Sequence, residues 1–193
     1  MCGFNGFVVT DATRDNAAVI RDMSDQIIHR GPDDDGYFVN DRVALGFRRL
    51  SIIDLEGGHQ PMTRKQDDFT VTFNGEIYNY RELRAELESR GYEFSTNSDT
   101  ETLLHGYVEW GDDLPTHLRG MYAFVIFDHT TGELFGARDI FGIKPFYYYK
   151  DGSTFLFGSE IKSFLKHPDF RKVFNAELLP AYLSFEYIPD HRT

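Results

Sequence analysis

The only cysteine of this 193-residue chain stands at position 2, directly after Met1. Removal of Met1 would leave Cys2 with a thiol and a free α-amine, so that a nucleophile and a base share one residue. An α-amine titrates near about 7.7 to 8.0 and can act as a general base at neutral pH. Gly3 has no side chain to block the sulfur. The pattern predicts nucleophilic catalysis by Cys2; the alternative is a small buried cysteine at the start of a strand.

A nucleophile that attacks a carbonyl group also needs hydrogen-bond donors for the oxyanion. The stretch FNGEIYNY at 73–80 offers two. Asn74 has a side-chain amide, and Gly75 has a backbone N–H that a substrate can approach closely. We expect the strand before them to end abruptly at Gly75. The alternative for these two residues is an ordinary Asn-Gly turn.

Several other kinds of site have no signature in this sequence. It contains no glycine-rich phosphate loop and no cysteine pair for zinc, and its seven histidines lack ligand spacing, so we expect no metal site. A formal net charge of -11 argues against a nucleic-acid partner, and no apolar run is long enough for a membrane span. A single cysteine and the absence of a secretory signal predict a cytoplasmic protein.

The order of the expected strands and helices that hold these residues predicts an α+β protein. Its antiparallel sheets are covered by helices, in place of a regular βαβ winding. Turn residues suggest a loop in RGPDDDG at 30–36 and a hairpin turn at Asp151–Gly152. Asp15 is expected to cap the first helix, and Ser98 or Asp99 a later one that ends at Gly111. Strands are expected at 2–9, 37–39, 43–47, 69–75, 121–128, 134–139 and 146–159, and further helices at 80–90, 159–167 and 175–185.

Eight blocks of the sequence together resemble one known family. They are MCGFNGF at 1–7, HRGPDDDGYF at 29–38, RRLSIIDLEGGHQPM at 48–62, FNGEIYNY at 73–80, SDTETLLHGYVEWG at 98–111, LRGMYAFVIFD at 118–128, RDIFGIKPFYY at 138–148 and FGSEIKSFL at 157–165. In this order they resemble the class II glutamine amidotransferase domain, the N-terminal-nucleophile type, over all of residues 1–193. Phe73, where sugar-amine and purine-pathway relatives are expected to have histidine, favours the branch of the glutamine-hydrolysing asparagine synthetases.

The resemblance implies a four-layer αββα sandwich and a set of roles. Cys2 would be the nucleophile with its own amine as base, and Asn74 with Gly75 would form the oxyanion hole. Arg49 would hold the α-carboxylate of glutamine and Asp99 its α-ammonium, whereas the residues alone suggest a surface salt-bridge partner and a plain helix cap. The pocket would further be lined by Glu76 and by the backbone of Leu50, Ser51, Ile52 and Ile53.

The implied reaction is hydrolysis of glutamine to glutamate and ammonia through a thioester, without a cofactor in this domain. The ammonia would serve an ATP-dependent synthetase in cis or in trans, most simply one that makes asparagine from aspartate, and ATP and Mg would bind to that synthetase domain. A catalytically silent docking or regulatory module and a different ammonia acceptor are the alternatives, and a homodimer is left open. In every active case Met1 must be removed.

Overall fold

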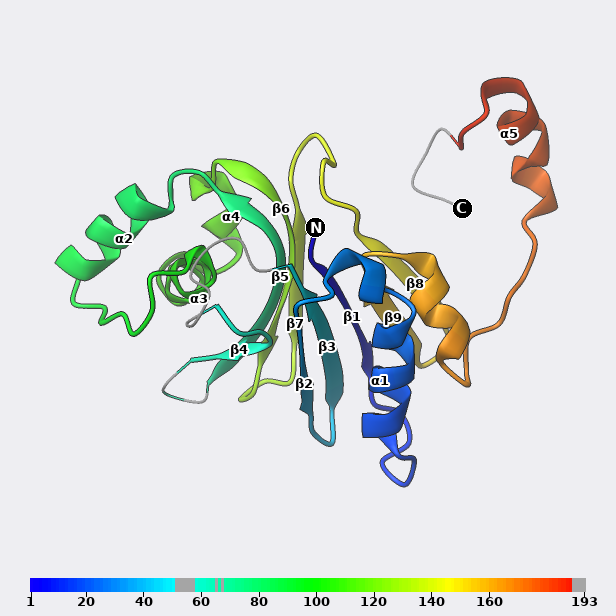
Figure 1. The fold of residues 1–193 in the computed structure, drawn as a ribbon, viewed down its shortest axis with the longest axis horizontal. Helices are drawn as coiled ribbons and strands as arrows, with labels where there is room; N and C mark the ends of the chain where they lie inside the picture. The colour runs from blue at the N-terminus through cyan, green and yellow to red at the C-terminus, as the bar shows by residue number, and fades with distance from the viewer. Residues whose placement is uncertain (51–57, 65, 67, 189–193) are drawn as a thin grey trace.

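The computed structural model describes residues 1–50, 58–64, 66 and 68–188. Two antiparallel sheets pack face to face in the middle of the molecule (Figure 1). The first has the order β2-β3-β1-β9-β8, made of Asp34–Val39, Val43–Arg49, Gly3–Val8, Thr154–Gly158 and Tyr147–Asp151. The second has the order β4-β5-β6-β7, made of Met62–Thr63, Phe69–Ile77, Gly120–Asp128 and Leu134–Arg138.

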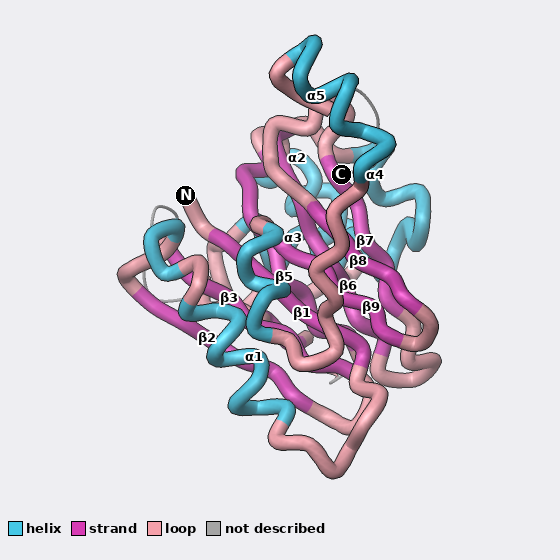
Figure 2. The backbone as a smooth tube through the Cα atoms, turned by 90° about the vertical axis from the view of Figure 1, so that its right-hand side faces the viewer, coloured by secondary structure: helices cyan, strands magenta, loops and turns pink. Residues whose placement is uncertain are grey.

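Helices cover the outer face of each sheet. Figure 2 shows α1 lying across the first sheet, and Figure 1 shows α2 and α3 beyond the second sheet, with α5 set apart from the sandwich. In the described part of the chain, no helix combines the length and apolar character needed to cross a membrane. The helices are α1 Asn16–Asp25, η1 Ile28–Arg30, α2 Tyr80–Ser89, α3 Asp99–Trp110, η2 Gly111–Asp113, α4 Leu114–His117, η3 Ile161–Lys166, η4 Ala176–Leu178 and α5 Leu179–Phe185.

Three apolar clusters separate the four layers. Side chains alternate along a strand, so Phe4 of β1 points between the sheets and Phe7 packs beneath α1. On β5, Phe73 packs beneath α3. Burial of each such ring contributes about 1.5 to 3 kcal/mol. The predicted α+β class and the αββα sandwich are both confirmed.

Local signals for helix ends are confirmed. The Asp15 carboxylate accepts a hydrogen bond from the N–H of Ala18 at 3.0 Å and caps α1. The Ser98 hydroxyl caps α3 by accepting from the N–H of Glu101 at 3.2 Å. Gly111 ends α3 with a φ of 54°, a value that favours glycine. These ends depend on contacts within a few residues, which is why the sequence predicts them.

Three predicted boundaries are wrong, in each case because strand pairing overrides a local turn signal. Residues 34–36 of the expected loop belong to β2, where they pair with β3. β5 does not end at Gly75 but continues to Ile77, because its last residues pair with β6. In the β8–β9 hairpin, Asp151 pairs with Thr154, so the turn lies one residue later than predicted. The helix expected at 159–167 forms the shorter 3-10 helix η3.

Candidate active site

Cys2 lies directly before β1, against the apolar cluster between the sheets. Its sulfur accepts a hydrogen bond from the N–H of Leu50 at 3.3 Å and donates one to the Leu50 carbonyl at 3.4 Å. Burial raises the pKa of the thiol, although the Leu50 hydrogen bond, the N-terminal amine and the charges of Arg49 and Lys144 act in the opposite direction. The thiol therefore needs a base nearby before it can attack a substrate.

A small cavity of about 60 Å³ opens beside the Cys2 sulfur. Four parts of the chain meet there: the start of β1, the end of β3, the second half of β5 and the first turn of α3. Its walls are formed by Cys2, Phe47, Arg49, Leu50, Gly58, Gln60, Phe73, Gly75, Glu76, Ser98, Asp99 and Thr100. The fold thus gathers six of the predicted site residues around one space, while Ser51, Ile52 and Ile53 lie outside the described residues.

Asn74 and Gly75 lie inside β5 and form no turn, so the Asn-Gly turn alternative is wrong. Asn74 is 1% exposed, and its side-chain nitrogen Nδ2 has no hydrogen-bond partner among the described residues. A buried donor without a partner costs about 1 to 3 kcal/mol. A Cβ atom at Gly75 would lie 2.3 Å from the Met121 carbonyl oxygen, which only glycine avoids. Asn74 does not itself line the cavity, but the Gly75 that follows it does.

Asp99 is the first residue of α3 and is 5% exposed. Its Oδ2 accepts a hydrogen bond from the N–H of Ile77 at 3.1 Å. Burial raises the pKa of this carboxyl to about 6 and the nearby charge of Glu76 adds to the rise, while backbone N–H groups oppose it. The helix-cap alternative is wrong because Ser98 fills that position. Asp99 is a buried carboxylate on a cavity wall, where a cation would stabilise its charge.

Arg49 is the last residue of β3 and is 5% exposed, which excludes the alternative of a surface salt-bridge partner. It lines the cavity together with Leu50 and Glu76. A guanidinium group at this place can bind both oxygens of a carboxylate. One cavity wall therefore has a group suited to an anion, and another has a group suited to a cation.

The sequence assigned no role to Gln60, which shapes the same cavity. Its Oε1 accepts from the N–H of Phe73 at 2.6 Å, and its Nε2 donates to the Phe73 carbonyl at 3.1 Å. The side chain thus holds the β5 backbone directly before Asn74, next to the two-residue strand β4. A glutamine in a glycine-rich loop has no motif of its own, so no sequence signal pointed to this role.

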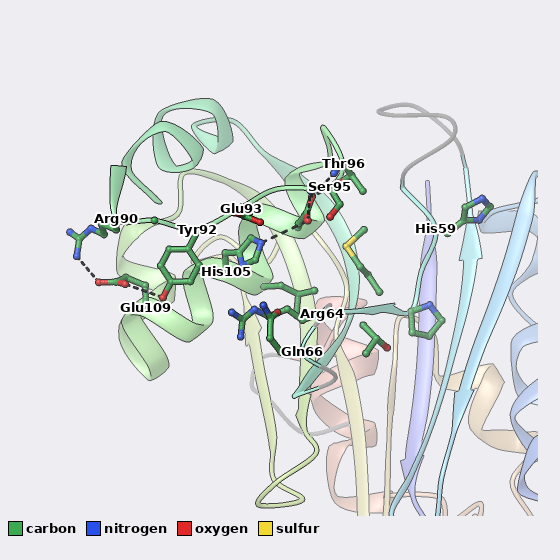
Figure 3. A pocket seen from close by; sticks show the side chains of 16 residues that line it. His59, Arg64, Gln66, Arg90, Tyr92, Glu93, Ser95, Thr96, His105 and Glu109 are labelled. Atoms are coloured by element: carbon green, nitrogen blue, oxygen red, sulfur yellow. Dashed lines mark hydrogen bonds and ion pairs between the residues drawn. The ribbon is translucent and has the colours of Figure 1, made fainter. Parts of the chain in front are cut away.

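A second and larger cavity, of about 750 Å³, lies on the other side of the first turn of α3 (Figure 3). Several of its charged side chains have partners: Arg90 and the Tyr92 hydroxyl both bind Glu109. Burial disfavours the charged form of Glu101, but His105 at 3.8 Å and hydrogen bonds from Ser95 and Thr96 outweigh it and lower the pKa to about 2. This cavity contains neither Cys2 nor Asp99.

No group of three or more metal-binding side chains occurs among residues 1–50, 58–64, 66 and 68–188. The groups described at or beside the small cavity are the Cys2 thiol, the Asn74 amide, the Arg49 guanidinium and the Asp99 carboxyl. These groups suit a small zwitterionic molecule that contains a carbonyl centre.

Two antiparallel sheets between helical layers give the chain the αββα fold class of the N-terminal-nucleophile hydrolases. Within that class, the chain belongs to the family described as the glutamine amidotransferase domain, whose profile matches residues 1–193.

Similar proteins come from bacteria and archaea. The chain is 45% identical over 196 residues to asparagine synthetase [glutamine-hydrolyzing] 1 of Bacillus subtilis (strain 168), covering 100% of this chain and 31% of that protein. It is 39% identical to a putative asparagine synthetase [glutamine-hydrolyzing] 2 of Methanocaldococcus jannaschii, covering 98% of this chain and 40% of that protein. The chain thus spans about a third of the length of these relatives.

A solved structure supports the fold. Glutamine phosphoribosylpyrophosphate amidotransferase from B. subtilis, solved with ADP and GMP, superposes with a TM-score of 0.71 at 23% sequence identity. The match covers 84% of this chain and 43% of that one. The shared sandwich extends over most of residues 1–193 at low identity.

Proposed function

We propose that this domain hydrolyses glutamine to glutamate and ammonia through a thioester on Cys2. The observation that carries the proposal is the buried Asn74 amide, whose Nδ2 has no hydrogen-bond partner among the described residues. It precedes Gly75, on the wall of the cavity that contains the Cys2 sulfur. Donors held in place without a partner are what an oxyanion requires, because no existing bond must break when the charge forms.

In the proposed mechanism, the α-amine of Cys2 takes the thiol proton and the sulfur attacks the side-chain carbonyl carbon of glutamine. The carbonyl oxygen becomes an oxyanion that accepts hydrogen bonds from Asn74 and Gly75. The C–N bond breaks as the amine returns the proton, and ammonia leaves. Water then cleaves the γ-glutamyl thioester, which releases glutamate and restores the thiol. The amine must be free, so the active protein lacks Met1.

The two ends of the amino-acid backbone of glutamine fit the two charged groups of the cavity. Arg49 binds the α-carboxylate with two hydrogen bonds, and Asp99 binds the α-ammonium. Glu76 and Leu50 complete the described wall, and the backbone of Ser51, Ile52 and Ile53 is proposed to continue it. The ammonium also explains a buried carboxyl with a pKa of about 6, because the ligand supplies the missing positive charge.

The ammonia is proposed to pass to an ATP-dependent synthetase part that makes asparagine from aspartate, since the named relatives are asparagine synthetases about three times as long. A cluster of exposed apolar side chains between β7 and β8 offers a surface for such a partner: Ile140, Phe141 and Ile143 are 92%, 86% and 56% exposed. ATP and Mg would bind to that partner, and the cytoplasm is the proposed location.

Glutamate release from glutamine tests the proposal. We expect wild-type protein without Met1, verified by intact mass, to release glutamate, and Cys2→Ala to lose about 10³-fold or more of that rate. The variant should keep its folded circular dichroism spectrum. Equal background rates from both proteins would instead identify a silent docking or regulatory module.

A further inference from the structure

Lys144 is a buried cation that the reaction described above does not use. It is 6% exposed, yet among the described residues its side-chain nitrogen forms no ion pair and donates no hydrogen bond. Lysine is rarely so little exposed without an acidic partner. The buried Arg48, in contrast, pairs with Asp25. Lys144 thus brings a positive charge into the sandwich that no carboxylate of the described residues pairs with.

The backbone of Lys144 is held firmly by Asp139, which is 5% exposed. The Asp139 carboxylate accepts hydrogen bonds from the N–H of Ile143 at 2.8 Å, of Lys144 at 3.0 Å and of Tyr122 at 3.2 Å. Tyr122 lies directly opposite Gly75 in the β5–β6 ladder. One carboxylate thus fixes the Lys144 loop to the strand that pairs with a predicted oxyanion-hole residue.

The sheet order brings the segments that lead into β1 and β8 to the same end of the first sheet. β1 and β8 both pair antiparallel with β9, so they run parallel to each other. Asn5 and Tyr147 both oppose Gly158, and counting three residues back from each reaches Cys2 and Lys144. Two strand spacings separate the backbones of β1 and β8 by about 10 Å where both pair with β9.

The space between these two positions is not filled by a strand, because β9 ends at Gly158. The neighbouring side chains show that both segments face the interior between the sheets: the rings of Phe4 and Phe146, two residues beyond Cys2 and Lys144, have centroids 5.8 Å apart. The positive charge of Lys144 also acts on the Cys2 thiol and favours its ionised form.

The geometry points to Lys144 as a positioning residue that stabilises the Cys2 thiolate, an inference that rests on the proposed role of Cys2 as nucleophile. Two other cations act on the thiol, the N-terminal amine of Met1 and Arg49, and the cavity also contains the carboxyls of Glu76 and Asp99. In the proposed complex of the protein without Met1, the substrate carboxylate pairs with Arg49, and the α-amine of Cys2 gives its proton to the departing ammonia. Lys144 is then the cation that still favours the thiolate.

The pH dependence of Cys2 alkylation by iodoacetamide tests this role, and the single cysteine makes the signal unambiguous. Wild type, Lys144→Met and Lys144→Arg are compared, each without Met1. We expect the pKa of Cys2 to rise by about half a unit to one unit in Lys144→Met, with an alkylation rate about 3- to 10-fold lower at neutral pH. Lys144→Arg keeps the charge and should stay close to wild type.

Lys150→Met is the matched control, because Lys150 lies on β8 of the same segment and is exposed. It should leave the alkylation profile unchanged. For glutamine, Lys144→Met should lower kcat with little change in KM, since Lys144 is not proposed to hold the substrate. If thermal unfolding shows that Lys144→Met is not folded, Lys144→Gln provides the same comparison.

An alkylation pKa in the uncharged variant equal to that of the wild type overturns the inference. A raised pKa that Lys144→Arg restores supports it. Alkylation requires no glutamine, so its outcome is separate from the Cys2→Ala assay. Failure of glutamate release would remove the proposed function, whereas an unchanged alkylation profile would remove only the role of Lys144.

Discussion

Two carboxyl groups on the first turn of α3 have opposite properties. Asp99 faces the small cavity beside Cys2, and Glu101 faces the larger cavity of Figure 3. Both side chains are largely buried. Nevertheless the pKa of Asp99 is raised to about 6 by burial, while that of Glu101 is lowered to about 2.

The difference lies in the hydrogen bonds that each carboxylate receives. Glu101 accepts bonds from the N–H groups of Ser95 and Thr96 and from the Thr96 hydroxyl, at 2.8, 2.7 and 2.7 Å. These bonds stabilise its charge and hold the chain that leads into α3. For Asp99, the backbone hydrogen bonds do not compensate for the burial of the ionised carboxylate. A fully partnered carboxylate supports the fold, and an incompletely partnered one is available to a ligand.

After loss of the Cys2 thiol itself, the largest effect is expected from Asn74→Ala on the small-cavity side. The variant removes one proposed oxyanion donor and should lower kcat for glutamine by about 10²- to 10³-fold. Thr72→Val is the matched control: Thr72 is also on β5, is fully buried, and has a hydroxyl without a partner among the described residues. Steady-state glutamate release checks both variants. Equal losses in both would show a general effect of altering β5 and would count against the oxyanion hole.

Asp99→Asn should weaken glutamine binding and stabilise the empty protein at the same time. Loss of the charge that is proposed to hold the α-ammonium should raise KM by up to about 100-fold. The folded pKa of about 6 lies above the ordinary value of 3.8, so the ionised carboxyl destabilises the fold, and this effect grows as pH rises from about 4 to 6.

Asparagine avoids this charge, so the free energy of unfolding of Asp99→Asn should exceed that of wild type by up to about 3 kcal/mol at pH 8 and by little at pH 4. Urea unfolding at the two pH values measures it. A variant that is less stable than wild type at pH 8 would contradict the idea that Asp99 is held for a ligand.

The replacement of arginine by lysine can be made at both cavities, and Arg49→Lys makes it at the small one. Lysine loses the second hydrogen bond to a carboxylate, so kcat/KM for glutamine should fall about 10-fold. Arg90→Lys makes the same replacement beside the larger cavity, where Arg90 binds Glu86 and Glu109, and should change kcat/KM less than about twofold. A similar loss in both variants would mean that Arg49 acts through the fold rather than on glutamine.

The smallest effect on activity is expected from Glu101→Gln. Because the folded pKa of Glu101 is depressed, its charge stabilises the protein above the ordinary value of 4.5, and this contribution is lost as pH falls towards about 2. The variant should therefore lose about 1 to 3 kcal/mol of unfolding free energy at pH 7 and much less near pH 2. Its kcat/KM should stay within about twofold of wild type. A large loss of activity without loss of stability would place Glu101 in the site.

Features set by near neighbours in the chain could be predicted from the sequence. The Asp15 and Ser98 caps and the helix end at Gly111 each depend on a few adjacent residues. The end of β5, in contrast, depends on a partner far along the chain: β5 continues past Gly75 because Gly120, Met121 and Tyr122 pair with it. The local Asn-Gly sequence does not indicate whether a distant strand will pair with these residues.

The candidate site follows the same division. The residue types and positions of Cys2, Asn74 and Gly75 are enough to suggest their chemistry. The resemblance of the whole chain to a known family supplied the expected roles of Arg49 and Asp99. Gln60 could not be found this way, because its role depends on hydrogen bonds with Phe73, and the proposed role of Lys144 depends on the action of its charge on Cys2.

The sequence by itself determined which chemical groups are present, where several helices begin and end, and the α+β class of the fold. Only the tertiary structure decided which of these groups remain without partners. Asp99 and Glu101 differ little as sequence, but burial and hydrogen bonds move their pKa values in opposite directions. The physical reason is that solvation and pairing of a buried charge depend on atoms from distant parts of the chain, which come together only when the four layers pack.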